Sequence, residues 1–400
     1  MTDPLGQSQV LSYLTGLSVD NKIVLISFEK AQRFDQNRSS IEQICTAKGI
    51  EWHPLLYTKK PPVLSTIYDI LRMINKSKKL HRQHSFDIVH CRGYITSIAG
   101  LQLKRKFGIK FVFDMRGFWI DEKSEGEGAW NSKNPLYKYV INYLRKKEKA
   151  FFLESGSIIT LTHAAAHVIG EQFSSLKNKV KVIPTCVNLD VFTAFNKTSR
   201  DEVRQKLGIP KDDFVLLYSG GSGPNYDRQF LIKALSHFNS IDKNIWLLIL
   251  SKDGNDELSK SMKNIISISV PYVEVHKYLM AGDVGIINYV NGRSVTGRSP
   301  TKLGEYWACG LPAISPAGVG DVDKLFKTYP DSGVVIDNYN FSPVSVSHFR
   351  NVNKAQLRKY AEDYFSLEKG IALYKEVYGE VTKQTNEYSS DLKTEQLYKV

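Results

Sequence analysis

The sequence predicts an α/β protein made of two successive doubly wound parallel-sheet units. Short runs rich in β-branched and aromatic residues alternate with longer helical stretches, a pattern typical of parallel strands joined by crossover helices. The alternation restarts after a polar stretch at residues 188–200. A chain of 400 residues is too long for one ordinary core and suits two domains of ~200 residues each.

Each unit has its own series of strands and helices. In the first unit we expect strands at Lys22–Phe28, Glu51–Tyr57, Asp87–His90, Lys110–Asp114, Ser157–Leu161 and Lys181–Pro184, and helices at Gln9–Leu17, Leu64–Gln83, Ile95–Lys106, Leu136–Glu154 and Ala164–Phe173. In the second unit we expect strands at Phe214–Tyr218, Ile245–Leu250, Ile265–Ser269, Val284–Asn288, Pro312–Ser315 and Gly333–Ile336. These elements predict domains at residues 1–192 and 193–365. Residues 366–400 are expected to form a last helix at Leu367–Lys383, which crosses back to the first domain, and a polar tail.

The composition excludes several classes of protein. The 42% apolar and 24% charged fractions indicate a folded chain, and no apolar run approaches the ~20 residues of a membrane-spanning helix. No basic stretch followed by an apolar one opens the chain, so no secretory signal is expected. The four cysteines, at positions 45, 91, 186 and 309, lack the spacing of a metal or redox site. We therefore expect a cytoplasmic protein with no metal and no other cofactor.

A net charge of +13 implies an anionic partner: nucleic acid, anionic lipid or a phosphorylated small molecule. Basic residues cluster without acids at residues 71–83, and two further basic clusters lie later in the first unit. Ile67, Leu71 and Ile74 interleave with the first cluster at helical spacing. This suits either a helix on an anionic membrane surface or a solvated helix packed on a sheet. No helix-turn-helix, zinc-finger or RNA-recognition signature is present, so we expect no nucleic-acid partner.

The segment Ser299–Pro312 is the most informative part of the chain. We expect a helix over Pro300–Cys309, because Ser299 is a good N-cap and Gly310 a good stop. A helix start presents free N–H groups and the positive end of the helix dipole, and Lys302 adds a full charge there. The sequence therefore predicts an anion site at this helix start.

Glu305 lies one turn further into this helix, with its side chain leaning back toward the helix start. A capping-box carboxylate would stand at position 302, so Glu305 is not explained as a cap. A carboxylate beside a phosphate-binding helix start is suited to hold a ribose diol. An exposed helical glutamate would show the same spacing, and this alternative stays open.

With these residues, the chain resembles the GT-B glycosyltransferases of family 4 over nearly its whole length. The further motifs that carry the resemblance are Asp3–Gln9, Asp87–His90, Phe113–Gly117, Ile183–Val187, Tyr218–Gly221 and Ala313–Asp321. The resemblance implies a GT-B fold, in which two Rossmann-like domains face a cleft. It also implies that the second domain binds a nucleotide-sugar donor, that the first binds the acceptor, and that transfer retains the configuration of the sugar.

The resemblance also assigns the donor site. It implies that Glu305 binds the ribose and that a glycine-rich turn approaches the diphosphate. The residues expected to contact the nucleotide-sugar are Gly6, Gly220, Gly221, Ser299, Thr301, Lys302, Glu305, Gly318, Val319 and Gly320. The loop after the strand at Phe214–Tyr218 also fits the rule that ligands of open α/β sheets lie beyond the carboxyl ends of strands. A plain glycine-rich turn at Gly220 is the alternative.

Two positions depart from the family pattern. Gly221 stands where an arginine usually contacts the diphosphate, and we expect Arg298 to supply that charge. The other candidates for this charge are Arg228 and Arg293. Gly297 stands where a first glutamate, eight positions before Glu305, normally contacts the donor sugar. The resemblance therefore does not imply how this protein recognises the donor sugar at position 297.

In the first domain, Asp114 ends a strand at the place where many family members have a histidine close to the reacting sugar. We expect Asp114 to accept a hydrogen bond from a sugar hydroxyl or to act as a base, and Arg116 to bind the leaving phosphate or an acceptor phosphate. The alternative is that Asp114 caps a turn and pairs with Arg116. His90 ends the neighbouring strand. It is either a hydrogen-bonded residue in the wall of the site or a participant in the reaction. The expected catalytic residues are Asp114, Arg116, Arg298 and Lys302.

No metal site is expected. Asp321 and Asp323 form an Asp-x-Asp pair that matches a metal-binding pattern, but Asp321 follows a glycine turn and is a natural N-cap for the next helix. No catalytic triad and no phosphate-binding Walker loop is present.

These observations predict a sugar-nucleotide-dependent glycosyltransferase, in the cytoplasm or peripheral on the inner face of the plasma membrane. Its acceptor is expected to be a glycan or lipid-linked glycan in bacterial cell-surface polysaccharide synthesis. Two alternatives are open: a nucleotide-sugar epimerase of the same fold, and a two-domain sugar-binding protein without catalysis.

The start of the chain carries a further expectation. Asp3–Gln9 resembles the loop after the first strand of family 4 enzymes, yet only Met1 and Thr2 precede it. That strand would lie between the strands at Lys22–Phe28 and Asp87–His90, whose backbone groups would otherwise lack partners. We expect a short apolar strand upstream of Met1. The alternative is that the neighbouring strands close the gap or that another segment fills it.

Overall fold

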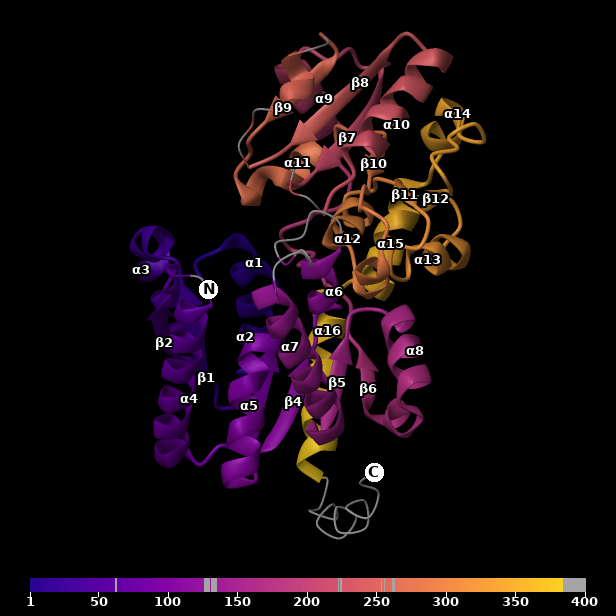
Figure 1. The fold of residues 1–400 in the computed structure, drawn as a ribbon. Helices are drawn as coiled ribbons and strands as arrows, with labels where there is room; N and C mark the ends of the chain where they lie inside the picture. The colour runs from indigo at the N-terminus through magenta and orange to yellow at the C-terminus, as the bar shows by residue number, and fades with distance from the viewer. Residues whose placement is uncertain are drawn as a thin grey trace.

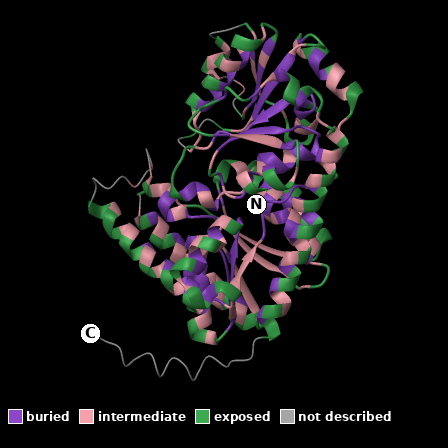
Figure 2. Cartoon of the chain, turned by 90° about the vertical axis from the view of Figure 1, so that its right-hand side faces the viewer, coloured by how far each residue is buried: buried purple, intermediate pink, exposed green. Residues whose placement is uncertain are grey.

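The computed structural model describes residues 1–61, 63–125, 130, 135–221, 223, 225–252, 254, 256–260 and 263–383. Two α/β units are stacked end to end, and the chain passes from the first to the second and back (Figure 1). Figure 2 shows mostly buried strands in the second unit and strands of both buried and intermediate exposure in the first, with exposed residues concentrated on the outer helices. The predicted α/β class, with parallel sheets in two units, is confirmed.

The first unit holds two parallel sheets. Its strands are β1 (Val24–Glu29), β2 (Glu51–Leu56), β3 (Ile88–Arg92), β4 (Lys110–Asp114), β5 (Ser157–Thr160) and β6 (Val180–Val182). Its helical segments are α1 (Pro4–Gly6), η1 (Gln7–Leu11), α2 (Ser12–Leu17), α3 (Ala31–Ala47), α4 (Leu64–His84), α5 (Tyr94–Phe107), α6 (Trp119–Ser124), α7 (Pro135–Glu154), α8 (His163–Gln172) and η2 (Ser174–Lys179). The sheets have the orders β1-β2 and β3-β4-β5-β6. In the described chain, the two strands on either side of the predicted gap, β1 and β3, therefore lie in separate sheets.

The second unit holds one parallel sheet of order β12-β11-β10-β7-β8-β9. Its strands are β7 (Phe214–Ser219), β8 (Ile245–Leu250), β9 (Ile265–Ile268), β10 (Val284–Ile286), β11 (Ala313–Pro316) and β12 (Gly333–Ile336). Its helical segments are α9 (Lys197–Leu207), α10 (Arg228–Ile241), η3 (Glu257–Lys260), η4 (Tyr272–Glu274), α11 (Val275–Leu279), η5 (Arg293–Gly297), α12 (Thr301–Ala308), α13 (Val322–Thr328), α14 (Val346–Arg350) and α15 (Lys354–Tyr364). The strand order changes direction between β7 and β10. The carboxyl ends of these two strands are therefore the topological switch point, where open α/β sheets bind ligands.

The chain crosses between the units at two places that lie side by side. The Val187 amide donates to the Phe365 carbonyl at 2.7 Å, and the Leu367 amide donates to the Val187 carbonyl at 3.1 Å. Helix α16 (Leu367–Lys383, yellow in Figure 1) then packs on the first unit against α2, β3 and β4. Its buried residues, among them Tyr374, join the core of that unit, so the C-terminal helix braces the first sheet.

The predicted strands are all present, each within two residues of its predicted ends, and α16 has the predicted bounds. The helix predicted at Gln9–Leu17 begins earlier, at Pro4, and includes a π-helical turn. The polar tail beyond Lys383 lies outside the described residues. Within the described part of the chain, no helix combines the length and the apolar character needed to cross a membrane.

Candidate functional site

Lys302 lies in a cage of tyrosine rings at the switch point of the second unit. Its ammonium nitrogen is 4.2 Å from the ring centroid of Tyr218, 4.4 Å from that of Tyr226 and 5.9 Å from that of Tyr289. The residue is 8% exposed, and no carboxylate of the described chain lies within ion-pair distance of it. Burial lowers the pKa of this lysine to about 7, against the opposite effect of Glu305. A buried ammonium that faces rings and no carboxylate is suited to bind an anion in the cleft.

The absence of a side chain at Gly220 leaves the space that the Lys302 ammonium occupies. The glycine has φ +155°, and a Cβ atom on it would clash with Lys302 Nζ and lie 3.2 Å from the Tyr218 hydroxyl oxygen. The Tyr218 hydroxyl donates to the carbonyl of Gly221. The glycines after β7 therefore let the lysine and the tyrosine ring occupy the end of the strand.

Glu305 and Thr301 face a cavity of about 260 Å³ between the two units. The opposite walls come from the N-terminal segment 7–15, from the crossing at residues 186–188 and from Tyr272. Burial raises the pKa of Glu305 to about 8, although Lys302 opposes this. Gly6 is not in the wall itself, but its neighbours Gln7 and Ser8 are. The cavity thus joins the predicted ribose residue to the predicted N-terminal loop.

The helix that carries Lys302 and Glu305 is not capped as predicted. Helix α12 begins at Thr301, Pro300 occupies the N-cap position, and no side chain caps it. The reason is that Ser299 bonds across to the first unit. The Thr185 amide donates to Ser299 Oγ at 3.2 Å, and Thr185 Oγ1 donates to the Ser299 carbonyl at 2.9 Å. Ser299 therefore joins the units instead of starting the helix.

Arg298 lies beside the tyrosine cage. Its guanidinium carbon is 5.0 Å from the ring centroid of Tyr289, and its Nη2 is 3.7 Å from Oε2 of Glu122 in the first unit. Its Nε is buried and has no hydrogen-bond partner in the described chain. Arg298, the residue predicted to supply a second positive charge to the diphosphate, therefore lies next to the tyrosine cage of Lys302. Its ion-pair partner is Glu122 of the other unit.

The turn Gly318–Gly320 has a structural role. Gly318 and Gly320 have φ of +80° and +50°. The Gly318 amide donates to the Asp323 carboxylate at 3.2 Å, and the Gly320 amide donates to the Val295 carbonyl at 3.1 Å. Val319 is fully buried. Both glycine amides are thus engaged within the protein, where they brace the segment that leads into α12.

The approach of helix α6 explains the glycine at position 297. A Cβ atom on Gly297 would lie 3.0 Å from the Gly117 Cα and 3.1 Å from the Phe118 amide nitrogen. A glutamate here would push the backbone of the first unit away, because these contacts are tighter than a real Cβ atom usually makes. The glycine that replaces the family's glutamate at position 297 is therefore explained by the close contact between the two units at Gly117 and Phe118.

Helix α6 and the residue that follows it bring two carboxylates to the second unit that the sequence did not indicate. Asn225 Nδ2 donates to Glu122 Oε1 at 3.0 Å, and the Ser294 amide lies 3.1 Å from both carboxylate oxygens of Glu125. No motif connects these residues, because each contact joins positions more than a hundred residues apart. Only the packing of α6 against the loops after β7 and β10 brings them together.

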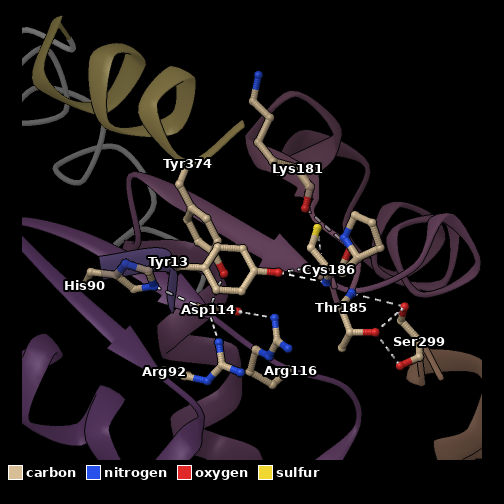
Figure 3. A network of polar contacts seen from close by, with 12 residues as sticks. Tyr13, His90, Arg92, Asp114, Arg116, Lys181, Thr185, Cys186, Ser299 and Tyr374 are labelled. Carbon is tan, nitrogen blue, oxygen red and sulfur yellow. Dashed lines mark hydrogen bonds and ion pairs between the residues drawn. The ribbon is translucent and has the colours of Figure 1, made fainter. Parts of the chain in front are cut away.

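Asp114 is the centre of a buried polar cluster at the carboxyl ends of β3 and β4 (Figure 3). It is 0% exposed, and the Tyr374 hydroxyl donates to its Oδ2 at 2.9 Å. The same oxygen is 3.4 Å from His90 Nε2 and 3.6 Å from Arg92 Nη1. Its Oδ1 is 4.0 Å from Arg116 Nη1. The predicted pair of Asp114 and Arg116 is thus part of a larger group.

These neighbours keep Asp114 ionised. Burial alone would raise the pKa of this carboxyl, but Arg116, His90 and Arg92 together lower it to about 2. A general base works best with a pKa near the working pH, so this carboxylate suits hydrogen bonding and electrostatics more than proton transfer. Arg92 was not predicted, since nothing in its spacing sets it apart from other arginines.

Comparison with known proteins supports the fold and the family resemblance. The model of Glycosyltransferase Family 4 matches residues 20–191. The uncharacterised glycosyltransferase MJ1059 of Methanocaldococcus jannaschii is 27% identical over 222 residues, 54% of this chain and 48% of its own. TuaC of Bacillus subtilis, a protein named for teichuronic acid biosynthesis, is 27% identical over 188 residues, 46% of this chain and 45% of its own. The chain spans about half the length of these curated relatives.

A solved structure extends the comparison to both units. The Anabaena protein Alr3699/HepE in complex with UDP-glucose matches with a TM-score of 0.64 at 12% identity, over 94% of this chain and 98% of that one. The protein has the GT-B fold, and its first unit resembles Glycosyltransferase Family 4. In this GT-B protein, the predicted donor residues separate into three groups. Gly220, Gly221, Arg298 and Lys302 surround the tyrosine cage, Thr301 and Glu305 face the cavity near Gly6, and Ser299 with Gly318, Val319 and Gly320 braces the start of α12.

The Asp-x-Asp pair of this GT-B protein binds backbone groups. The Asp321 carboxylate accepts from the amides of His163 at 2.7 Å and Ala164 at 2.9 Å, at the start of α8. Asp321 occupies the predicted N-cap position of α13, but its side chain does not bond to that helix and instead caps α8 of the other unit. In the described residues, no group of three or more potential metal ligands is found.

Proposed function

We propose that this protein is a retaining glycosyltransferase that moves a sugar from a nucleoside diphosphate donor to a hydroxyl of a glycan or lipid-linked glycan. The observation that carries the proposal is Lys302, a buried ammonium at the start of α12 with no carboxylate partner in the described chain. A diphosphate in front of it would meet the ammonium, the first-turn amides and the positive end of the helix dipole. The structural neighbour Alr3699/HepE binds UDP and UDP-glucose, which supports a donor of this class.

The nucleoside of the donor is assigned to the cavity beside α12. Glu305 faces this cavity from the same helix as Lys302, and Tyr272 lines it from the second unit. A ribose diol would hydrogen-bond to the carboxyl group of Glu305, and the diphosphate would then extend toward the tyrosine cage. This arrangement orients the sugar toward the first unit, where Asp114 ends β4.

In the proposed reaction the bond between the anomeric carbon and the diphosphate oxygen breaks, and the acceptor hydroxyl oxygen bonds to the anomeric carbon on the same face of the sugar. The hydroxyl proton passes to the departing diphosphate. Lys302 and Arg298 would stabilise the charge that develops on the departing diphosphate. Arg298 would exchange its long contact with Glu122 for this anion. Asp114, kept ionised, would accept a hydrogen bond from a sugar hydroxyl and so hold the sugar in place. We propose no metal and no other cofactor for this step.

The acceptor is proposed to be a bacterial surface polysaccharide, or its lipid-linked precursor. The relative TuaC, named for teichuronic acid biosynthesis, supports this class. A lipid-linked acceptor would bring the protein to a membrane, and we place it on the cytoplasmic face. Helix α4 supports this: its basic stretch follows Ile67 and Leu71, which are 48% and 54% exposed.

A thermal-shift screen across nucleoside diphosphates tests the donor. A ligand at 100 times its dissociation constant stabilises a protein by ~2.7 kcal/mol, which is readily detected. The nucleotide that stabilises the wild type should have a much smaller effect on Glu305→Ala. A screen in which no nucleotide stabilises the wild type, or in which Glu305→Ala responds equally, would contradict the assignment.

The matching nucleotide-sugar then separates the proposed activity from its alternatives. A transferase releases the nucleoside diphosphate and forms a new glycan when acceptor is present. An epimerase changes the sugar without acceptor, which NMR of the sugar detects. A sugar-binding protein does neither. Product analysis with and without a surface glycan therefore decides between the three functions.

Membrane binding is tested by sedimentation with neutral and anionic vesicles. Basic residues near an anionic surface contribute ~1 kcal/mol each, and salt screens them. The wild type should sediment with anionic vesicles at low salt and be released at high salt. The double variant Ile67→Ser/Leu71→Ser should bind less while keeping every positive charge. Equal recovery in the supernatant with both vesicle types would refute this part of the proposal.

A further inference from the structure

The cluster around Asp114 has more positive than negative charge. Arg92 and Arg116 both approach the single Asp114 carboxylate, and His90 stands beside them (Figure 3). The shortest guanidinium distances to this carboxylate are 3.6 Å from Arg92 and 4.0 Å from Arg116, both beyond the usual 2.7–3.2 Å of an N–H···O hydrogen bond. Asp114 therefore neutralises one of the two guanidiniums and hydrogen-bonds to neither.

Polar atoms inside the cluster lack partners. In the described chain, Arg116 Nη1, His90 Nε2 and Asp114 Oδ1 are buried and make no hydrogen bond. Buried polar groups are nearly always hydrogen-bonded, since an unmade bond costs free energy. A guanidinium nitrogen, a histidine ring nitrogen and a carboxylate oxygen without hydrogen bonds at a single place therefore indicate a polar ligand that accepts from the arginine.

The two guanidiniums also lie close enough to repel each other. Burial lowers the pKa of Arg92, and the nearby Arg116 lowers it further, while Asp114 opposes both effects. Two like charges in one half-buried place are stable when an anion stands between them. Side-chain exposures of 29% for Arg92 and 14% for Arg116 leave both within reach of a solute.

The backbone at Arg116 is in an unusual conformation that aims its side chain into this cluster. Arg116 has φ +56°, in the left-handed region that residues other than glycine seldom adopt. The next residue, Gly117, touches Gly297 just before α12. Strained residues of this kind concentrate where function requires a fixed side-chain position. The cluster therefore lies beside the segment that carries the proposed donor site.

We propose that Arg92 and Arg116 bind an oxyanion of the acceptor, a phosphate or a carboxylate, beside the Asp114 carboxylate. The assignment of the oxyanion to the acceptor rests on the function proposed above, whereas the anion site itself does not. The acceptor would then be an acidic or phosphorylated glycan, and a neutral glycan would bind weakly. A bidentate contact to each guanidinium would satisfy the donors that the protein leaves unpaired.

The test separates this anion from the donor diphosphate. Inorganic phosphate is titrated against the full chain in the Lys302→Met background, in which the nucleotide side lacks its buried ammonium, and ³¹P line broadening reports binding. Lys302→Met should bind phosphate, and Lys302→Met/Arg116→Gln should bind it at least tenfold more weakly. The control variant is Lys302→Met/Arg105→Gln, which removes an equal charge from an exposed arginine of the same unit. Its affinity for phosphate should equal that of Lys302→Met.

Two results would overturn the proposal. Loss of phosphate binding in Lys302→Met alone would show that the phosphate belongs to the nucleotide side. Equal affinity in Lys302→Met and Lys302→Met/Arg116→Gln would show that Arg116 holds no anion. If the glutamine variant does not fold, as judged by circular dichroism, Arg92→Gln in the same background gives the same comparison. Failure of the proposed function would appear elsewhere, as a wild type that no nucleoside diphosphate stabilises.

Discussion

Replacing Lys302 by methionine removes the charge from the tyrosine cage and keeps most of the side chain's length. The ammonium has aromatic rings around it and, in the described chain, no carboxylate within ion-pair distance. Cation–π contacts contribute ~2 kcal/mol when desolvated, but burying the ammonium costs a comparable amount. The free energy of unfolding should therefore change by no more than about 1 kcal/mol, because methionine packs well against aromatic rings.

Nucleotide binding should respond much more strongly. A charge-assisted contact to the diphosphate is worth ~1.5–3 kcal/mol, which corresponds to an increase of about 10- to 150-fold in the dissociation constant. Calorimetric titration of wild type and Lys302→Met with the nucleoside diphosphate selected by the thermal screen measures this ratio. Stability is measured on the same samples by denaturant unfolding.

Lys354 provides a matched control. It is also a lysine whose pKa burial lowers, to about 8, and its ammonium lies 4.7 Å from the ring centroid of Phe195. Its Nζ donates to the carbonyl of Gly310, behind the far end of α12. Lys354→Met should leave nucleotide affinity unchanged. If Lys302→Met and Lys354→Met bind the nucleotide equally well, the reasoning that places the diphosphate at the cage is refuted.

Three further predictions concern the same cleft. The low pKa of Lys302, about 7 against about 10.5 in an unfolded chain, means that it loses its charge as the pH rises through 7. A bound diphosphate favours the ammonium, so calorimetry should show nucleotide affinity falling above pH 7, and Lys302→Met should lose this slope. Glu122→Gln should free Arg298 and strengthen nucleotide binding two- to fivefold, since a partly exposed ion pair is worth only ~0.5–1 kcal/mol; weaker binding would show that Glu122 supports the site. Asp114→Asn should lower turnover with little change in nucleotide affinity, and steady-state kinetics beside calorimetry would reveal a merely structural aspartate by an equal loss of both.

Local sequence patterns were sufficient for the strands but not for the cap of α12. The strands of the second unit are continuous apolar runs, because helices cover both faces of the parallel sheet. Ser299 has every local property of an N-cap, yet its hydroxyl bonds to Thr185, which is 114 residues away. A rule based on neighbouring residues cannot include such a partner.

The candidate site was predictable where its residues share one helix. Lys302 and Glu305 are a single turn apart, so spacing alone places them together. The tyrosine cage, Arg92 and Glu122 were missed because they come from separate loops, strands and helices that only the packed units bring near one another. Tyrosine and arginine are too common for any one of them to be noticed without a motif.

Gly304, in the middle of α12, ties the donor side of the cleft to the place where the chain changes units. A Cβ atom on this glycine would lie 2.7 Å from Val187 Cγ2 and 3.0 Å from Phe365 Cγ, the two residues whose backbones bond to each other at the crossing. The helix that carries Lys302 therefore packs directly on the crossing, with no side chain of residue 304 between them. Any larger residue at position 304 would have to displace either the crossing or this helix, so the position of the buried ammonium depends on how the chain passes between the units.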